Sequence, residues 1–374
     1  MRRREFLEAG ALTAIGSLVT RTLGAQTAET LGVHTASPQN LATPLRYFDR
    51  EITPTRAFFV RSHFGPPRLD RGRRLLIDGS VRTPLDLDLA ALTAMPQTTV
   101  TAVLQCAGNG RALHAPRVAG IQWAHGGMSQ ATWTGVPLRD LLARAGVRRG
   151  AAHVELRTAD LSPKPTVPAF LRSIPLDRAM EETTMVAHSM NGAPLGLLHG
   201  APFRLVVPGW SGNHWLKWLV GIHVQENEAQ GFYMQTGYRM PRAPVEPGAA
   251  VPPEQTVPAT TFPVKSVIAS PAGGERRPAG PQQVVGVAFS GEAPIAKVEV
   301  SVDGGRTWAE ASLEGERSLG RWVVFRHRFD AAAGPVRALA RASDARGGVQ
   351  PERAAWNPSG YFWNAWHAVE WVVG

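Results

Sequence analysis

The sequence contains a single cysteine, Cys106, among its 374 residues. One cysteine cannot form a disulfide within the chain, and it cannot hold an iron–sulfur cluster, which needs several thiolates. The Cys-x-x-Cys-His pattern of covalently attached haem is also absent. If the protein is a redox enzyme, its electrons must pass to an acceptor outside the chain or through a cofactor that is held in another way.

Long apolar runs and lysines are scarce as well. No run of about 18 apolar residues occurs, so the sequence predicts no membrane-spanning helix. The formal net charge is +10, but only four of the 40 basic residues are lysines (Lys164, Lys217, Lys265 and Lys297). The basic residues are scattered and no aromatic–basic RNA pattern accompanies them, so we expect no nucleic-acid partner.

The first residues are typical of an export signal. Residues 3–7 read Arg-Arg-Glu-Phe-Leu, an apolar stretch follows at 9–20, and small residues stand at 24–25. An ordinary secretion signal is the alternative, but this order favours a twin-arginine signal over residues 1–25, with cleavage near Ala25. That route exports folded proteins, often with a cofactor inserted, so we expect a periplasmic protein whose residues 26–45 form a mobile leader.

The length favours two domains. Residues 46–238 mix strand-like segments at 75–78, 98–105 and 203–207 with a short helix at 138–145, which predicts an α+β domain. Six prolines within 239–262 predict an extended connector. Residues 263–374 predict an immunoglobulin-like β-sandwich, because an Asp-Gly-Gly turn lies among strand-like segments at 284–289, 296–302, 321–329 and 336–342.

The strongest chemical signal is the segment Leu-Gln-Cys-Ala-Gly-Asn-Gly-Arg at 104–111. A strand ends in Cys106, and a glycine-rich turn follows that exposes backbone N–H groups and lets a bulky ligand approach closely. Arg111, just beyond, favours the thiolate over the thiol. A lone cysteine is more often a buried structural residue. These residues alone therefore leave a ligand role and a structural role equally open.

The Cys-Ala-Gly-Asn-x-Arg pattern resembles the molybdenum-ligand motif of the sulfite oxidase family. Further segments are similar to family elements in the same order: 59–63, 189–195, 199–209, 217–219, 303–308, 356–358 and 364–367. The resemblance covers about residues 46–371. It implies a molybdopterin-binding domain followed by a dimerisation domain, and a molybdenum ion bound by one pterin dithiolene and by the Cys106 thiolate.

The resemblance also implies roles for single residues. The cofactor contacts that it implies are His63, Cys106, Asn109, His199, Arg204 and Lys217. Cationic side chains suit the phosphate at the end of the pterin. The substrate contacts that it implies are Arg61 and Arg111. A single charged residue is more often solvated than bound to a ligand, and a single histidine is more often part of a core. These assignments therefore rest on the order in which the motifs occur along the sequence.

Three positions on the substrate side depart from the family pattern. Phe170 stands where the family is expected to have a tyrosine, and it lacks the hydroxyl that binds an anion or relays a proton. Ser359 takes the place of an arginine of the animal enzymes. His214 falls near a further anion-binding arginine and replaces its charge in part when it is protonated. Phe170 and His214 are thus included among the predicted catalytic residues.

The resemblance implies oxygen-atom transfer, with sulfite oxidised to sulfate and electrons passed to a c-type cytochrome by a homodimer. The departures keep open another sulfur substrate, such as protein-bound sulfane sulfur or a sulfoxide. An exported binding protein without redox chemistry is a further alternative. A serine hydrolase is weakly indicated, because Gly209-Trp210-Ser211-Gly212 lacks the last glycine of a nucleophile elbow. Zinc-hydrolase and dinucleotide-binding motifs are absent.

Overall fold

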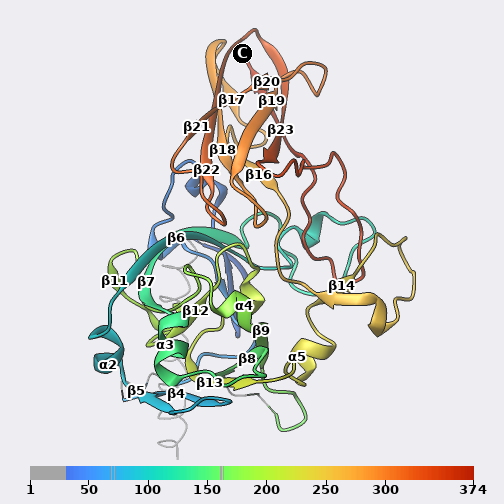
Figure 1. Ribbon diagram of the computed structural model, residues 1–374. Helices are drawn as coiled ribbons and strands as arrows, with labels where there is room; N and C mark the ends of the chain where they lie inside the picture. Colours follow the sequence, from blue (N-terminus) through green and yellow to red (C-terminus); the bar gives the residue numbers. More distant parts are fainter. Residues whose placement is uncertain (1–30, 69, 71, 161, 163) are drawn as a thin grey trace, which may run out of the picture.

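The computed structural model describes residues 31–374 except 69, 71, 161 and 163, and it shows two parts stacked on one another (Figure 1). The predicted signal at 1–25 lies outside the described residues. The predicted mobile leader is wrong for its described part, because β1 (Gly32–Ala36) pairs antiparallel with β2 (Gln39–Ala42). In turn β2 pairs with β3 (Val60–Arg61), which closes a three-stranded sheet next to the first domain.

The first part holds two five-stranded sheets. One sheet has the order β11-β10-β7-β6 with β12 also on β10, and its strands are β6 (Thr98–Gln105), β7 (Met128–Pro137), β10 (Met185–Met190), β11 (Ala193–Pro194) and β12 (Arg204–Val206). The other has the order β5-β4-β13-β8-β9, and its strands are β4 (Leu75–Gly79), β5 (Leu85–Leu87), β8 (His153–Thr158), β9 (Arg172–Pro175) and β13 (Leu219–Gln225). Only β13 and β4 are parallel within these sheets.

Helices are few and short in the described residues, so this part is mostly β and the α+β expectation holds only in part. The α-helices are α2 (Leu89–Thr93), α3 (Leu138–Ala145), α4 (Leu176–Ala179) and α5 (Phe232–Gln235). The predicted helix at 138–145 is confirmed: α3 follows Pro137, buries its apolar face and ends at Gly146, whose φ of 72° suits glycine. None of the helices in the described part of the chain is long and apolar enough to cross a membrane.

The proline-rich connector is more ordered than predicted. Within it β14 (Arg239–Pro241) pairs antiparallel with β15 (Thr256–Pro258), so the chain doubles back between the two parts. Short 3₁₀ helices occur here and elsewhere: η1 (Leu45–Tyr47), η2 (Thr55–Ala57), η3 (Arg111–Leu113), η4 (Leu197–His199), η5 (Gly212–His214) and η6 (Pro253–Gln255).

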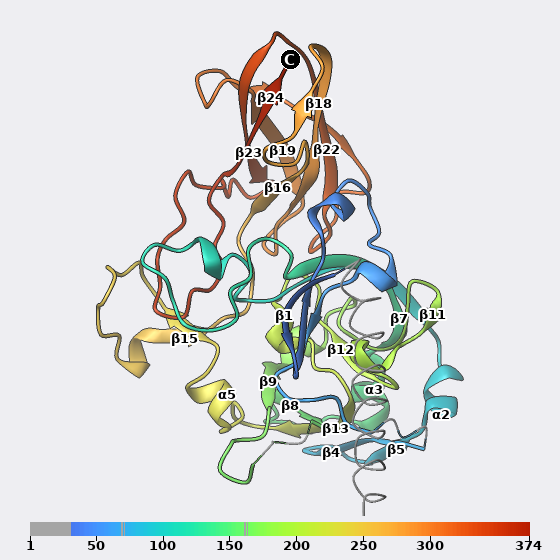
Figure 2. The same cartoon turned by 180° about the vertical axis from the view of Figure 1, so that it is seen from behind.

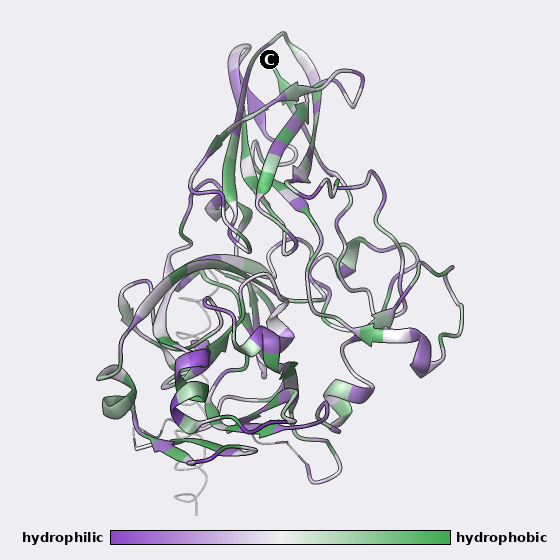
Figure 3. Cartoon of the chain, viewed as in Figure 1, coloured by the Kyte–Doolittle hydropathy of each residue, from purple (hydrophilic) through white to green (hydrophobic). Residues whose placement is uncertain are grey.

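The second part consists of two β-sheets. One sheet has the order β16-β18-β22-β21: β16 (Lys265–Ser270), β18 (Gly280–Phe289), β22 (Val323–Ala331) and β21 (Ser312–Glu314). The other has the order β17-β24-β23-β19-β20: β17 (Arg276–Arg277), β24 (His367–Val373), β23 (Gly334–Asp344), β19 (Ile295–Ser301) and β20 (Ala309–Glu310). Buried and exposed residues alternate along β24, and Figure 3 shows hydrophobic and hydrophilic stretches interleaved on these strands.

A shared hydrophobic core joins the two parts. Phe48, Val103 and Met128 from the first part pack in one cluster with residues of β16, β18 and β22 and with Trp322. The fully buried Trp322 also donates from Nε1 to the carbonyl of Glu51 (2.8 Å). Seen from behind, η1 lies against the second part near β16 (Figure 2). The two parts are therefore packed as one body around the segment that precedes Cys106.

Candidate functional site

The turn after β6 presents Cys106 at the end of a buried strand. Its backbone N–H donates to Gly127 (2.9 Å), which ties the turn to the loop before β7. Gly110 has φ 97°, and a Cβ at this position would lie 2.6 Å from the Cβ of Trp363 in the second part. A side chain here would strain the backbone and push the second part away. The glycine-rich sequence thus allows the turn to fit beneath the C-terminal segment.

The side chain of Asn109 stabilises this turn through hydrogen bonds. It is buried, its Oδ1 accepts from the N–H of Gly127 (3.0 Å), and its Nδ2 donates to Gln105 Oε1 (3.2 Å). It lines neither of the two cavities beside Cys106. The structure therefore gives Asn109 a role in shaping the loop, and it does not place the side chain at the predicted cofactor contact.

Two adjoining cavities meet at Cys106. They have about 740 and 890 Å³ of empty space, including space open to solvent. Both are lined by Arg61, His63, Cys106 and Tyr238. Cys106 is the chain's free cysteine, and its residue surface is 8% exposed. Its side chain therefore faces two partly open cavities that a ligand can occupy.

The first cavity brings together the predicted cofactor contacts His199, Arg204 and Lys217. Arg204 on β12 donates to the carbonyls of His199 (3.0 Å) and Trp215 (3.1 Å), and its Nε is buried without a hydrogen-bond partner. Lys217 donates to Leu198 O and to a serine hydroxyl, both at 3.1 Å. Most of their bonds go to neutral carbonyls, which leaves positive charge available to an anionic ligand.

Burial shifts the pKa values in this cavity. It lowers the pKa of Arg204 to about 9 and, despite the nearby carboxylate of Asp160, the pKa of Lys217 to about 7. Burial also raises the pKa of Asp160 to about 6, and one of its oxygens has no hydrogen-bond partner. Burial and the two cations lower the pKa of His199 to about 3, so its ring is neutral. Among the described residues, the unpartnered Nε of Arg204 fits an anionic group of a ligand and the unpartnered oxygen of Asp160 fits a hydrogen-bond donor. Asp160, which follows β8, was not predicted from the sequence.

The second cavity holds the predicted substrate contacts. Arg111 donates from Nε and Nη2 to the carbonyl of Ser359 (3.2 and 3.1 Å) and from Nη1 to Ile121 O (3.1 Å). Arg61 donates from Nη2 to His63 Nδ1 (3.0 Å). Both guanidinium groups are thus fixed in orientation, and no carboxylate in the described part of the chain pairs with them. Ser359 contributes a carbonyl oxygen where the resemblance implied a cation.

Phe170 has no hydroxyl, but Tyr238 provides one at the same cavity. The Tyr238 hydroxyl lies 3.4 Å from His63 Nδ1, and its residue lines both cavities with Cys106. Phe170 is also in the cavity wall, with its ring 5.4 Å from that of His63 and 5.8 Å from that of Tyr238. Phe170 therefore acts as an apolar wall, and its lack of a hydroxyl does not leave the site without one.

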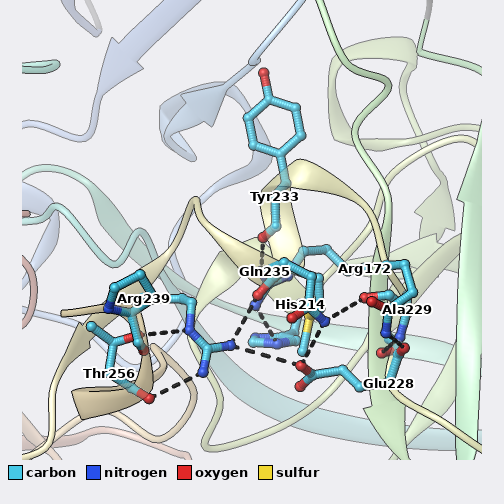
Figure 4. A network of polar contacts seen from close by, with 12 residues as sticks. Arg172, His214, Glu228, Ala229, Tyr233, Gln235, Arg239 and Thr256 are labelled. Atoms are coloured by element: carbon cyan, nitrogen blue, oxygen red, sulfur yellow. Dashed lines mark hydrogen bonds and ion pairs between the residues drawn. The ribbon is translucent and has the colours of Figure 1, made fainter.

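His214 does not occupy the predicted place in the anion site. It is fully buried and lines neither cavity, and its Nε2 accepts from Arg172 Nη2 at 2.7 Å (Figure 4). Burial, followed by the charges of Arg172 and Arg178, lowers its pKa well below the usual value. His214 is thus uncharged at neutral pH. The loop after Trp210 turns it inward, which sequence spacing alone did not reveal.

The hydrolase alternatives have no support in the geometry. Ser211 is fully buried and its hydroxyl donates to Ala259 O (2.9 Å), so it is neither exposed nor next to a base. Within the part of the chain that the structure describes, no group of three His, Cys, Asp or Glu residues is placed to bind a metal. A zinc site of the hydrolase type is therefore not formed by these residues.

The two parts of the chain belong to the class of proteins that join a molybdopterin-binding domain to a dimerisation domain. The family model described as an oxidoreductase molybdopterin binding domain matches residues 63–233, and that of the Mo-co oxidoreductase dimerisation domain matches 257–373. The chain belongs to the sulfite oxidase family of molybdopterin-dependent oxidoreductases. Binding of the molybdenum cofactor follows from this membership.

Individual relatives agree with this assignment. Mitochondrial sulfite oxidase of Homo sapiens is 35% identical over 92% of this chain, which spans 66% of the human protein. Sulfite oxidase of Arabidopsis thaliana is 32% identical over 85% of this chain and 87% of the plant protein. The sulfane dehydrogenase SoxCD from Paracoccus pantotrophus matches with a TM-score of 0.78 and 30% identity, over 89% of this chain and 84% of that chain.

Proposed function

We propose that the protein oxidises sulfite to sulfate and passes the electrons to an external c-type cytochrome. The observation that carries this proposal is the convergence of Arg61, Tyr238 and Cys106 on the same two cavities. A small oxyanion needs a cation and a hydrogen-bond donor beside the redox centre, and these residues supply both next to a sulfur ligand. Sulfite oxidases at 32–35% identity support the choice of substrate.

The residues of the first cavity fit the cofactor. The soft Cys106 thiolate is a suitable ligand for molybdenum. Arg204 and Lys217 would bind the pterin phosphate, with Asp160 and neutral His199 making polar contacts to the pterin. When bound, the cofactor supplies the two-electron oxidation and the oxygen atom that is transferred.

The residues of the second cavity would bind and orient the substrate. Arg61 and Arg111 neutralise the anion, and their guanidinium groups are already held in place before substrate arrives. The Tyr238 hydroxyl would donate to a substrate oxygen. Burial and the neighbouring Arg61 lower the pKa of His63 to about 4, so neutral His63 keeps an acceptor for Arg61 at neutral pH.

Sulfane sulfur bound to a carrier protein is the second candidate substrate. Two observations favour it: the similarity to the sulfane dehydrogenase SoxCD, and the carbonyl of Ser359 at the place of an expected cation. A cavity with less positive charge has a weaker preference for a small free dianion over a less charged substrate. Turnover of a protein persulfide in preference to sulfite would establish this candidate.

We further propose a homodimer formed through an immunoglobulin-like second domain, which matches the dimerisation-domain model. The cytochrome partner and export through the twin-arginine route complete the proposal, the latter on the strength of residues 3–7. Analytical ultracentrifugation tests the dimer, and fractionation of cells that express the chain with Arg3→Lys and Arg4→Lys tests the export route.

Molybdenum analysis of the purified protein, followed by sulfite-dependent reduction of cytochrome c on the same sample, tests the main proposal. We expect about one molybdenum per chain together with sulfite activity, since one cysteine ligand is available. Molybdenum without sulfite activity would contradict the substrate and direct the search to the sulfane candidate. Absence of molybdenum, from a host that makes the cofactor, would contradict the cofactor role of Cys106.

A further inference from the structure

Arg172 is a fully buried arginine without an acidic partner in contact. It begins β9, and its residue exposure is 0%. Its Nη1 donates to the carbonyl of Tyr233 and its Nη2 to His214 Nε2, while its Nε has no partner (Figure 4). Among the described residues, no carboxylate accepts a hydrogen bond from Arg172 or forms an ion pair with it. Burying a cation without an acidic partner costs folding free energy, so its presence here calls for a functional explanation.

The guanidinium lies over the ring of Tyr238. The Arg172 Cζ is 5.7 Å from the Tyr238 ring centroid, and the hydroxyl of the same tyrosine lies 3.4 Å from His63 Nδ1 beside the two cavities. Burial lowers the pKa of Arg172 to about 10, so the group keeps its charge at neutral pH. Its partner His214 is neutral and therefore does not compensate that charge.

A second set of bonds holds the segment that contains Tyr238. Gln235 donates to Glu228 Oε2 (3.0 Å) and to Ala229 O (2.9 Å), which holds α5 in place. Arg239, next to Tyr238, donates to Thr256 Oγ1 (2.9 Å) and lies 3.7 Å from Glu228, as Figure 4 shows. Glu228 is thus engaged by Gln235 and Arg239, and it acts on Arg172 through space, with no hydrogen bond or ion pair between the two among the described residues.

We propose that Arg172 is a positioning residue that supplies the additional positive charge of the anion site through the ring of Tyr238. The resemblance led us to expect part of this charge at His214; a cation, Arg172, instead lies on β9 and is bonded to His214. The charge orients the Tyr238 hydroxyl toward a bound oxyanion and attracts that anion through a low-dielectric interior, without touching it. This inference rests on the proposed function, because it assumes that the second cavity binds a sulfur oxyanion.

The test is equilibrium binding of sulfate, measured by titration calorimetry on the molybdenum-loaded protein, together with KM and kcat for sulfite. We expect Arg172→Met to weaken sulfate binding and raise KM by about tenfold or more, with a smaller change in kcat. Arg172→Lys keeps the charge and should retain affinity within about threefold of the wild type. If Met and Lys weaken binding equally, or if neither does, the charge role is wrong.

A double-variant cycle tests whether Arg172 acts through Tyr238. We expect Tyr238→Phe to remove most of the effect of Arg172→Met, so that the double variant binds sulfate much more tightly than additivity predicts. Additive losses would contradict the coupling. If Arg172→Met does not fold, Arg172→Gln carries the same test, because its amide can still donate to a neighbouring acceptor while it lacks the charge.

Arg178→Met is the matched control. Arg178 is also mostly buried, donates to the carbonyl of Pro208 and lies over an aromatic ring, that of Trp210 at 5.0 Å, but Trp210 lines neither cavity whereas Tyr238 lines both. We expect wild-type sulfate affinity for this variant, and a loss equal to that of Arg172→Met would show that any buried arginine has this effect. Failure of the wild-type protein to bind sulfate would instead contradict the proposed substrate class.

Discussion

Cys106 is the residue on which the proposed chemistry depends, and its replacement gives the most direct prediction. Cys106→Ser removes the soft sulfur while keeping a side chain of similar size, so we expect folding to be preserved and activity to fall by roughly 100-fold or more. Activity assays and circular dichroism of the same preparation measure both effects.

Ser211→Ala is a suitable control for that experiment. It changes a buried residue that the rival hydrolase hypothesis needs, and it lines neither cavity. We expect redox activity near that of the wild type. Wild-type activity in the Cys106 variant would show that the cysteine is only structural.

Lys265 predicts a pH dependence of stability. It is buried between the two parts, its Nζ lies 5.3 Å from the Trp363 ring centroid without a hydrogen bond, and burial lowers its pKa to about 7. Burial, with a smaller contribution from the charge of Lys265, lowers the pKa values of His114, His125 and His367. Between pH 7 and 10.5 the unfolded chain therefore binds a proton at Lys265 that the folded chain lacks, and stability rises with pH.

Urea denaturation of the wild type and of Lys265→Met across this range measures the effect. We expect the variant to be the more stable protein near pH 7, because it has no buried amine to desolvate, and the difference to shrink toward pH 10. The other titrating groups largely cancel in the comparison. A difference in unfolding free energy that is constant with pH would show that the lysine keeps its proton in the folded state.

At the scale of the element, the Cys106 turn depends on Asn109. Asn109→Ala leaves the N–H of Gly127 and the side chain of Gln105 without their partners, which we expect to cost about 1–3 kcal/mol of unfolding free energy. A loosened turn should also reduce the molybdenum content of the purified protein. Full molybdenum content together with unchanged stability would show that the turn holds its shape without this side chain.

Several elements were predictable because local signals sufficed for them. The strand at 98–105 and the helix at 138–145 agree with β6 and α3 at both ends, since β-branched residues and a proline–glycine boundary define them. The strand-like segments of the second part correspond to β18, β19, β22 and β23 within a few residues. The two strands at 32–42 were not predicted, because β1 and β2 are short and polar. They form by pairing with each other, and β2 also pairs with the distant β3.

The candidate site was predictable where a motif carried it and not where it depended on long-range packing. Cys106, Arg61 and Lys217 lie in recognisable segments and converge as expected. Tyr238 and Arg172 come from loops and strand ends with no such pattern, and only the folded chain brings them together. The placement of His214 was wrong for the same reason, since a side chain in a short 3₁₀ turn can point to either side.

At the scale of the whole molecule, the shared core predicts that the two parts unfold together. Trp322→Ala removes a fully buried side chain from that core and the hydrogen bond to Glu51, which should cost about 3–5 kcal/mol. We expect one cooperative transition in the wild type, and an earlier, broader one in the variant, by scanning calorimetry. Two separate transitions in the wild type would contradict the shared core.

The bond between Arg111 and the carbonyl of Ser359 joins residues that are 248 positions apart in the chain. During synthesis the ribosome releases Cys106 and Arg111 long before it makes Ser359, so the guanidinium has only its bond to Ile121 until the C-terminal segment emerges and docks. A chain cut short before this segment would contain the complete metal-ligand motif but not the geometry that orients Arg111. Full activity, unlike the motif, is thus a property that only a finished and docked polypeptide acquires.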